Sequence, residues 1–470
     1  MLPRALYQAP AWRAMAAGVP PDGTPEVLER CARAALAAIL RHYPEAVHVG
    51  VLAATATDSL GVRLAQLLRP WRRVSLIPVD APVSAWEPAL RCAHLLVDAT
   101  SLEGRGTEWA VRGAQARLLN SVPVPLLALG MPGGVDGDTG WVEGEALRAD
   151  ATLALLGLRP AHCTGRALEF RGTLLFDAAG SEPLTRELAV FARRYGRREA
   201  PALPSTAKTA HKGSAGRLLL IAGGPGLAGA AVLGAHAAVT AGIGLLRIVT
   251  HQSHTSSLTI HVPEALVLDA DHWGGVSADA VDAIAIGSGL LPDAWGLRLW
   301  HAALSVGCPL VVDAGALRLL ADHPERRSDW ILTPHPGEAA ALLGTDVHAI
   351  ERDRWGAAAA IVDRYGGVCI LKGAGTILAA QGRMEVCDHG NPALAIGGSG
   401  DMLTGCAGAL YARGLDAWAA AAVAVAVHGR AGEDLAQQCA RGHHAEDLIA
   451  AMRTELCAWP TASESARCGW

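Results

Sequence analysis

Asp401 is the residue of this sequence best placed to do chemistry, because it closes a glycine cluster, GGSGD, that runs directly into an apolar helical pattern. Gly397, Gly398 and Gly400 allow the backbone to approach a ligand closely, and the amides at the start of the following helix favour an anion such as phosphate. A carboxylate repels phosphate, so Asp401 must serve a proton or a cation. The structural alternative is a glycine-rich turn with an N-capping aspartate.

Other loops that follow predicted strands carry residues suited to the same ligand. Gly223–Ala231 and Ile286–Leu290 are small-residue loops that permit close approach. In Thr333–Glu338, the prolines and the acid account for a helix start without His335, so the histidine indicates ligand contact. Leu371–Thr376 ends a strand with a lysine and two glycines, which can hold a polyphosphate through charge and backbone amides.

Strands and helices that alternate along the chain must position these loops. Alternation of this kind predicts an α/β fold with two doubly wound layer-sandwich domains, whose ligand-binding edges lie at the carboxyl ends of the strands. In the first domain we expect a helix at Val27–His42 and strands at Ala46–Ala53, Val74–Val79, Leu95–Asp98 and Pro125–Leu129. In the second we expect strands at Arg217–Ala222, Leu245–Thr250, Ala283–Gly287, Pro309–Asp313, Trp330–Thr333 and Val368–Lys372, followed by helices at Leu415–Val427 and Ala445–Leu456.

The length of 470 residues favours two domains. Ser181–Gly216 is charged, contains prolines and lacks periodicity in its later half, so we interpret it as a linker. The predicted domains are therefore 1–200 and 201–470.

The composition and the N-terminal sequence indicate which kinds of partner and which cellular location to expect. A net charge of −5 gives no basic face, which argues against nucleic acid as the main partner. The N-terminus lacks the pattern of a secretory signal, and the alanine-rich stretches are too short to span a bilayer, so we expect a cytoplasmic protein. Ten scattered cysteines without a C-x-x-C pair predict neither disulfides nor a metal site built from them.

The order of the loops in the second domain carries a family resemblance. HKG at 211–213, IGSGL, VVDAGAL, LTPHPGEAAALLG, LKGAGT and GNPALAIGGSGDMLTG resemble the ADP- or ATP-dependent NAD(P)H-hydrate dehydratases, over about residues 205–457. In the first domain, VDATSLEGRG, PGGVDGDTG and RADATLALLGLRPAH resemble the NAD(P)H-hydrate epimerase domain that is fused to the dehydratase in bifunctional bacterial repair enzymes. The resemblance implies a Rossmann-like first domain and a ribokinase-like second domain, and we expect a homo-oligomer.

The resemblance also implies a role for each matching residue. The positions that hold the adenine nucleotide, ADP or ATP with Mg²⁺, are Lys372, Gly373, Ala374, Gly375, Thr376 and Gly400. Those around the hydrated nicotinamide nucleotides NADHX and NADPHX are Ala230, Ala231, Gly289, His335 and Asp401, and Asp401 is the catalytic acid/base position. Phosphorylation of the ring hydroxyl makes it a leaving group, and elimination then restores NADH or NADPH.

The first domain departs from its family where chemistry is expected. The Asn-Asn-Gly-Gly-Asp-Gly loop that grips substrate and K⁺ is replaced by residues 54–59, in which only Asp58 survives. The Asp-Ile-Pro-Ser-Gly loop is replaced by Gly130–Gly134, which removes a carboxylate, while Asp98 matches a family aspartate. We therefore predict that the K⁺ site and most of the epimerase activity are lost.

Two other functions stay open. A ribokinase-like kinase of a small molecule, such as a vitamin precursor, would share Asp401 and the anion site, although the TPHPGE and LKGAGT loops fit it less well. A non-catalytic nucleotide-binding regulator is the other, and intact Lys372, His335 and Asp401 argue against it. The sequence does not decide between ADP and ATP. The order of the two domains resembles that of the bacterial enzymes, and this resemblance favours ADP.

Overall fold

The computed structural model describes residues 2–17, 24–53, 59–100, 113–181, 187–439 and 442–462. The chain forms two compact units, residues 1–194 and 195–470, and each is considered by itself.

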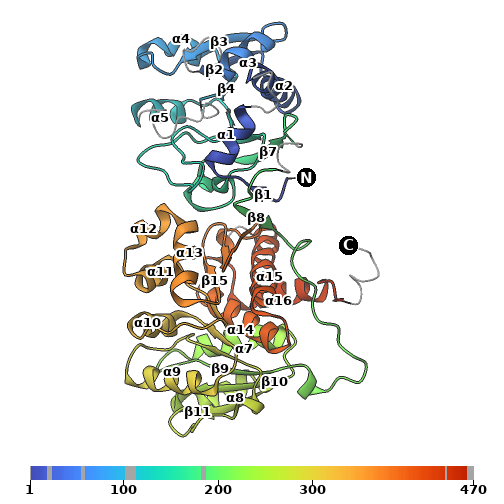
Figure 1. Ribbon diagram of the computed structural model, residues 1–470, viewed down its shortest axis with the longest axis vertical. Helices are drawn as coiled ribbons and strands as arrows, with labels where there is room; N and C mark the ends of the chain where they lie inside the picture. Colours follow the sequence, from blue (N-terminus) through green and yellow to red (C-terminus); the bar gives the residue numbers. More distant parts are fainter. Residues whose placement is uncertain are drawn as a thin grey trace. The chain divides into compact units, whose positions relative to one another are not determined.

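The first unit is built on a six-stranded parallel sheet in the order β3-β2-β4-β5-β6-β7. Strands β2, β3, β4 and β7 of this sheet are labelled in Figure 1. Four of its strands confirm the prediction, whereas β6 and β7 were not predicted. The strands are β2 (His48–Ala53), β3 (Arg73–Pro78), β4 (Leu95–Asp98), β5 (Leu126–Leu129), β6 (Ala151–Leu155) and β7 (Thr173–Asp177).

Helices cover both faces of this sheet, which makes it doubly wound as predicted. Successive residues of a strand point to opposite faces, so Val51 joins one core cluster and Leu52 the other. The first cluster packs against α1 (Ala9–Ala17), α2 (Thr24–His42) and α3 (Leu60–Leu68), and the second against α4 (Glu87–Cys92) and α5 (Gly113–Ser121).

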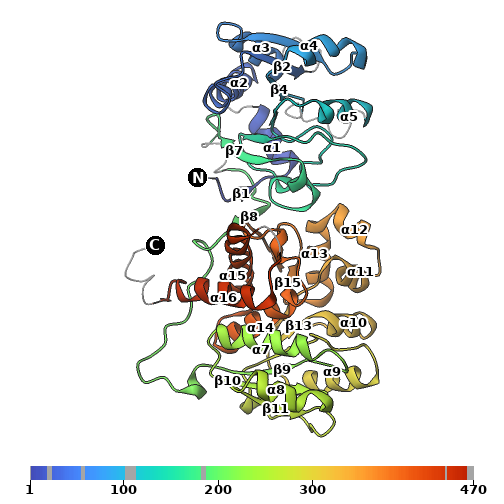
Figure 2. The ribbon, with the colours of Figure 1, turned by 180° about the vertical axis from the view of Figure 1, so that it is seen from behind.

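The second unit contains a larger sheet in the order β17-β16-β15-β14-β13-β12-β9-β10-β11 (Figure 2). Seven neighbouring strands are parallel, and β16 and β17 are antiparallel. The six predicted strands are confirmed, and three more are present. The strands are β9 (Arg217–Ile221), β10 (Leu245–Thr250), β11 (Ala265–Asp269), β12 (Ala283–Ile286), β13 (Leu310–Val312), β14 (Trp330–Leu332), β15 (Val368–Leu371), β16 (Ile377–Ala380) and β17 (Arg383–Cys387).

One face of this sheet is packed by helices rich in small residues. They are α7 (Ala228–Thr240), α14 (Ser399–Ala412), α15 (Ala417–Gln438) and α16 (Ala445–Cys457). A Cβ at Gly405 of α14 would lie 1.9 Å from the carbonyl oxygen of Gly234 in α7, so these two helices touch through their backbones. The remaining helices are α8 (Thr255–His261), α9 (Ala294–Val306), α10 (Ala314–Asp322), α11 (Pro336–Leu343), α12 (Val347–Arg352) and α13 (Arg354–Tyr365).

The interpretation of Ser181–Gly216 as a linker throughout was wrong. Ala192–Tyr195 forms β8, which pairs antiparallel with β1 (Ala5–Leu6), and the Tyr195 carbonyl accepts a hydrogen bond from the Asp388 amide at 2.9 Å. The strand was missed because four residues with two arginines show no apolar alternation.

Within the described residues, the cysteines are free thiols, and no helix is long and apolar enough to cross a membrane.

Candidate active site

The loops predicted to bind ligand meet where the winding of the second sheet reverses. β9 lies between β10 and β12, and in open α/β sheets such a switch point is the usual ligand site. The Gly223 amide donates to the Ser288 carbonyl at 3.0 Å, and the Gly224 amide donates to the Gly289 carbonyl at 2.8 Å. These bonds join the loop after β9 to the loop after β12.

The predicted substrate positions in these loops lie together. Gly289 has φ +67, and a Cβ there would lie 3.2 Å from the Cβ of Ala230. The Cβ of Ala231 lies 3.0 Å from the position of a Cβ on Gly223. Side chains larger than glycine and alanine would push the two loops apart, so the small residues allow the loops to pack closely.

Asp401 lies in the first turn of α14, beside the same switch point. The N-cap is Gly398, with φ +87 and no side chain to cap the helix, so the N-capping role considered for Asp401 is wrong. The first amides of α14 receive no side-chain cap and carry the positive end of the helix dipole. The helix start therefore offers an anion site with a carboxylate at its edge.

Burial and neighbouring charges make Asp401 a stronger base than an exposed aspartate. Burial is the largest cause, and the negative charges of Asp313 and Glu338 add to it, so that the pKa of Asp401 rises to about 6. Ser288 and Lys372 act in the opposite direction. Ser288 is fully buried. Its hydroxyl lies close enough to the Asp401 carboxyl to lower the pKa of that carboxyl.

Lys372 occupies the centre of this group of acids. Its Nζ lies 2.9 Å from Asp313 Oδ1 and 3.7 Å from Glu338 Oε2. It also lies 3.5 Å from the position of a Cβ on Gly400, so the structure brings Lys372, Gly400 and Asp401 together as predicted residues of one site. Burial alone would lower the pKa of Lys372, but the two carboxylates outweigh it and raise the pKa.

Sequence reasoning missed the role of Asp313 and assigned Glu338 only to a helix dipole. Asp313 is 2% exposed and also accepts a hydrogen bond from Thr333 Oγ1 at 2.7 Å. The strand end in VVDAGAL was the available signal, because an acid at the carboxyl end of a buried parallel strand faces the ligand-binding edge.

His335 has a structural role that the sequence interpretation denied. Its Nδ1 accepts hydrogen bonds from the amides of Gly337 at 2.9 Å and Glu338 at 3.2 Å, while Glu338 Oε2 accepts from the His335 amide at 2.8 Å. His335 is thus the N-cap of α11 in a reciprocal capping box. Its side chain is 52% exposed, which leaves a ring edge open to solvent.

The predicted nucleotide loop, residues 372–376, rests on a buried arginine. Arg354 Nη2 donates to the Lys372 carbonyl at 3.1 Å, and its side chain is 1% exposed. A Cβ at Gly373, where φ is +137, would lie 2.8 Å from the Arg354 guanidinium, so only glycine fits there. Thr376 Oγ1 donates to the Gly373 carbonyl at 3.2 Å and closes the loop.

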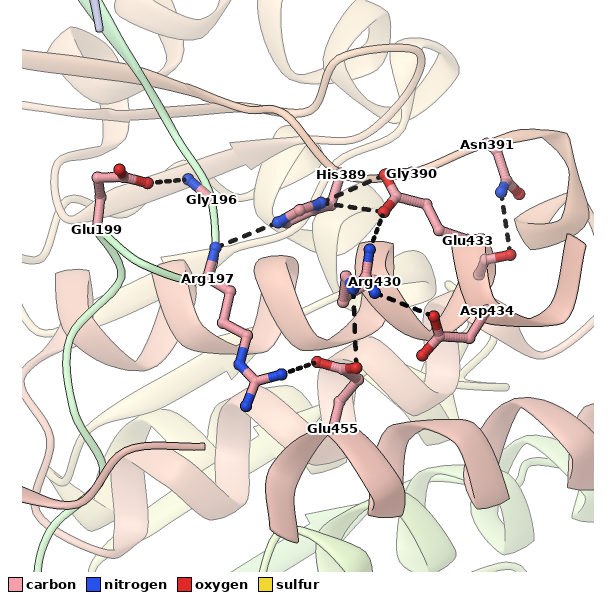
Figure 3. A network of polar contacts seen from close by, with 11 residues as sticks. Gly196, Arg197, Glu199, His389, Gly390, Asn391, Arg430, Glu433, Asp434 and Glu455 are labelled. Carbon is pink, nitrogen blue, oxygen red and sulfur yellow. Dashed lines mark hydrogen bonds and ion pairs between the residues drawn. The ribbon is translucent and has the colours of Figure 1, made fainter. Parts of the chain in front are cut away.

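Helix α15 contacts the segment that leads to Asp401 at two places, and Figure 3 shows the first of them. Before the glycine cluster, His389 Nδ1 lies 3.1 Å from Glu433, and the side-chain Nδ2 of Asn391 donates to the Gly432 carbonyl at 3.0 Å. Within the cluster, His428 Nε2 lies 2.9 Å from Ser399 Oγ. Burial lowers the pKa of His428 to about 4, so this anchor is uncharged at neutral pH.

Comparisons with known proteins agree with this geometry. A sequence model of NAD(P)H-hydrate dehydratase matches residues 218–454, and a model of the YjeF-related protein N-terminus matches residues 34–161. The bifunctional NAD(P)H-hydrate repair enzyme of Escherichia coli is 37% identical over 76% of this chain and 71% of its own length. The chain belongs to the NAD(P)H-hydrate repair enzyme family.

Further relatives support the family and the fold. The bifunctional NAD(P)H-hydrate repair enzyme of Coxiella burnetii is 36% identical over 78% of this chain and 77% of its own length. A ribokinase-like superfamily protein from Enterococcus faecalis superposes with a TM-score of 0.51 at 23% identity, over 55% of this chain and 93% of that one. The predicted ribokinase-like fold of the second unit is confirmed, and family membership favours the dehydratase over a vitamin-precursor kinase or a non-catalytic regulator.

In this family member, both carboxylate oxygens of Asp98 in the first unit accept hydrogen bonds from neighbouring loops. Asp98 Oδ1 accepts from Thr100 Oγ1 at 2.6 Å and from the Thr100 amide at 3.1 Å, and Oδ2 accepts from the Gly133 amide at 2.7 Å. Its side chain is buried, and burial raises its pKa. Asp58 lies outside the described residues.

The described residues of this chain show no cluster of metal ligands. They contain no group of three or more His, Cys, Asp or Glu side chains arranged to hold a metal. Mg²⁺ is commonly bound through one or two carboxylates together with nucleotide phosphates, so we predict that Mg²⁺ would bind here together with the nucleotide.

Proposed function

We propose that the second unit, in the predicted domain 201–470, dehydrates NADHX and NADPHX to NADH and NADPH at the expense of ADP or ATP. The observation that carries the proposal is the position of Asp401. Its carboxylate has a raised pKa and lies at the uncapped start of a helix, next to the loop that carries Lys372 and Gly373.

Each part of the site has a proposed task. The crossing at Ala230, Ala231 and Gly289 receives the nicotinamide portion, with His335 at its edge. Lys372, Gly400 and the loop 373–376 hold the phosphates of the nucleotide through charge and backbone amides.

Asp401 then acts as the base. It takes the proton from the ring hydroxyl as the hydroxyl oxygen attacks the terminal phosphorus of the nucleotide, and the amides of α14 stabilise the negative charge on the transferred group. With ADP, the bond to the leaving AMP breaks. Loss of phosphate from the phosphorylated ring, with loss of a ring proton, restores the dihydronicotinamide double bond, so water is removed at the cost of one phosphoanhydride.

The first unit, in the predicted domain 1–200, is proposed to be an epimerase-like domain without effective epimerase activity. Both oxygens of Asp98 already accept hydrogen bonds from the protein, and Gly130 stands where the family supplies a carboxylate. The loss of the K⁺ site, assembly into a homo-oligomer and a cytoplasmic location stay predictions.

Incubation of the protein with hydrated NADH or NADPH and with ADP or ATP tests the proposal. We expect the near-ultraviolet absorbance of the reduced cofactor to return, with stoichiometric release of phosphate and of AMP from ADP. A stable phosphorylated product would instead identify a kinase, and nucleotide binding without any product would identify a regulator.

A further inference from the structure

Asp313 follows β13 at the N-cap position of α10, yet its side chain does not cap that helix. An aspartate at an N-cap ordinarily accepts hydrogen bonds from the first helical amides. Here no such bond is present, and the carboxylate instead turns to Lys372 Nζ at 2.9 Å and Thr333 Oγ1 at 2.7 Å. The start of α10 therefore does not explain why an acid is buried at this position.

Four groups, each from a different part of the fold, face Asp401 in α14. Asp313 precedes α10, Glu338 lies in α11, Lys372 follows β15, Ser288 follows β12, and Asp401 itself lies in the first turn of α14. Lys372 is thus the positive charge near three carboxylates, those of Asp313, Glu338 and Asp401. The negative charge of Asp313 offsets the positive charge of Lys372, so Lys372 stabilises the Asp401 carboxylate less than it would without that ion pair.

We propose that Asp313 is a positioning residue that holds the Lys372 ammonium in an ion pair, so that this ammonium does not neutralise the Asp401 carboxylate. The inference rests on the proposed function, because a base that accepts and then gives up a proton during turnover needs this balance.

Two effects of Asp313 act in the same direction. Its own negative charge disfavours ionisation of Asp401, and its ion pair with Lys372 restrains the positive charge that favours ionisation. Burial would raise the pKa of Asp313, but Lys372 and the hydroxyls of Thr333 and Thr404 outweigh burial and lower the pKa, so Asp313 stays ionised while Asp401 titrates.

The test is a pH titration of Asp401 in the full chain. The carbonyl stretch of the protonated Asp401 carboxyl is isolated in infrared difference spectra between each protein and its own Asp401→Asn derivative. We expect the midpoint in Asp313→Asn to fall by about one pH unit or more, because both effects are removed. Glu338→Gln should shift it in the same direction by less, since Glu338 is the weaker neighbour.

Asp282→Asn is the matched control. Asp282 forms an ion pair with Arg217 at 2.6 Å before β12, away from the residues that influence Asp401, so its loss should leave the midpoint in place. An unchanged midpoint in Asp313→Asn would overturn the inference whatever Glu338→Gln does, and Asp313→Ala, which also removes the charge, decides the question if Asp313→Asn does not fold. Because the titration needs no turnover, its result is independent of whether the wild-type protein dehydrates NADHX.

Discussion

Asp401 shares one lysine with two other buried carboxylates, and this crowding has consequences for catalysis and for stability. The side chain titrates near pH 6, so it is ionised and basic at neutral pH. An exposed aspartate would be ionised too, but as a weaker base by about two pKa units. The site therefore gains basicity by placing like charges together in a buried position.

Asp401→Asn should abolish dehydration and leave nucleotide binding intact, because Lys372, Gly400 and the amides of α14 remain. General-base catalysis is worth about 100-fold or more, so less than about one hundredth of the wild-type turnover is expected. Steady-state rates and calorimetric titration with ADP and ATP measure the two properties separately. Turnover above about a tenth of the wild-type value would show that another group is the base.

The same substitution should stabilise the second unit at high pH. The pKa of Asp401 is about 6 in the folded protein and about 3.9 in an unfolded chain, so the ionised carboxyl destabilises the fold above pH 6. That cost falls as the pH falls from 6 towards 4. Asp401→Asn should therefore raise stability at pH 8, by about 2 to 3 kcal/mol at most, and raise it less at pH 5.

Calorimetric unfolding at pH 5 and pH 8 measures this difference, and Asp282→Asn provides a contrast of opposite sign. The hydrogen bond from Arg217 lowers the pKa of Asp282, so that carboxylate stabilises the fold above its unfolded pKa and loses the effect as the pH falls through the folded value. An Asp401→Asn protein that is less stable than wild type at pH 8 would contradict the raised pKa.

At the scale of secondary-structure elements, the sequence predicted those strands whose apolar runs are buried on both faces. Leu95–Asp98 and Arg217–Ile221 are examples, because such runs are short, continuous and followed by loops. β8 and β17 escaped prediction because they are short and carry arginine or glutamate, so they show no apolar alternation. Loop motifs identified Asp401 and Lys372, whereas the pairing of Lys372 with Asp313 joins residues 59 positions apart and cannot be seen in local spacing.

The position of Asp401 depends on how closely α14 approaches α7. Gly405→Ala would place a methyl group 1.9 Å from the Gly234 carbonyl oxygen and must push the helices apart. We expect a loss of stability of about 1 to 3 kcal/mol, together with a lower turnover, since the first turn of α14 moves with the helix.

Gly229→Ala in α7 is the matched control, because its added methyl group meets no atom within 4 Å and has no backbone strain. It should leave stability unchanged or raise it by about 0.5 to 1 kcal/mol through helix propensity. Thermal unfolding of both variants gives the comparison, and equal effects at the two positions would show that the contact between the helices does not hold α14 in place.

At the scale of the whole molecule, the two units differ in what lies at the carboxyl ends of their strands. The first unit retains a parallel sheet with a core on each face, and Asp98 now ties the loop after β4 to the loop after β5 through the Gly133 amide. In the second unit, side chains from four other segments surround the Asp401 carboxylate. The stability of such a sheet comes from its buried faces and not from its loops, so the first unit would keep its fold if it has lost epimerase activity as predicted.

The full chain is accordingly expected not to epimerise the hydrated cofactor. Epimerisation requires a positioned acid or base, and Asp98 has both oxygens engaged while Gly130 lacks a carboxylate. The measurement offers the pure R epimer to the protein without nucleotide and follows conversion by chromatography against a sample without protein, since spontaneous interconversion sets the baseline. Conversion clearly faster than that baseline, and abolished by Asp98→Asn while the dehydratase activity of the same variant persists, would restore a bifunctional repair enzyme. Conversion at the baseline rate in both proteins would leave Asp98 as a residue that joins two loops.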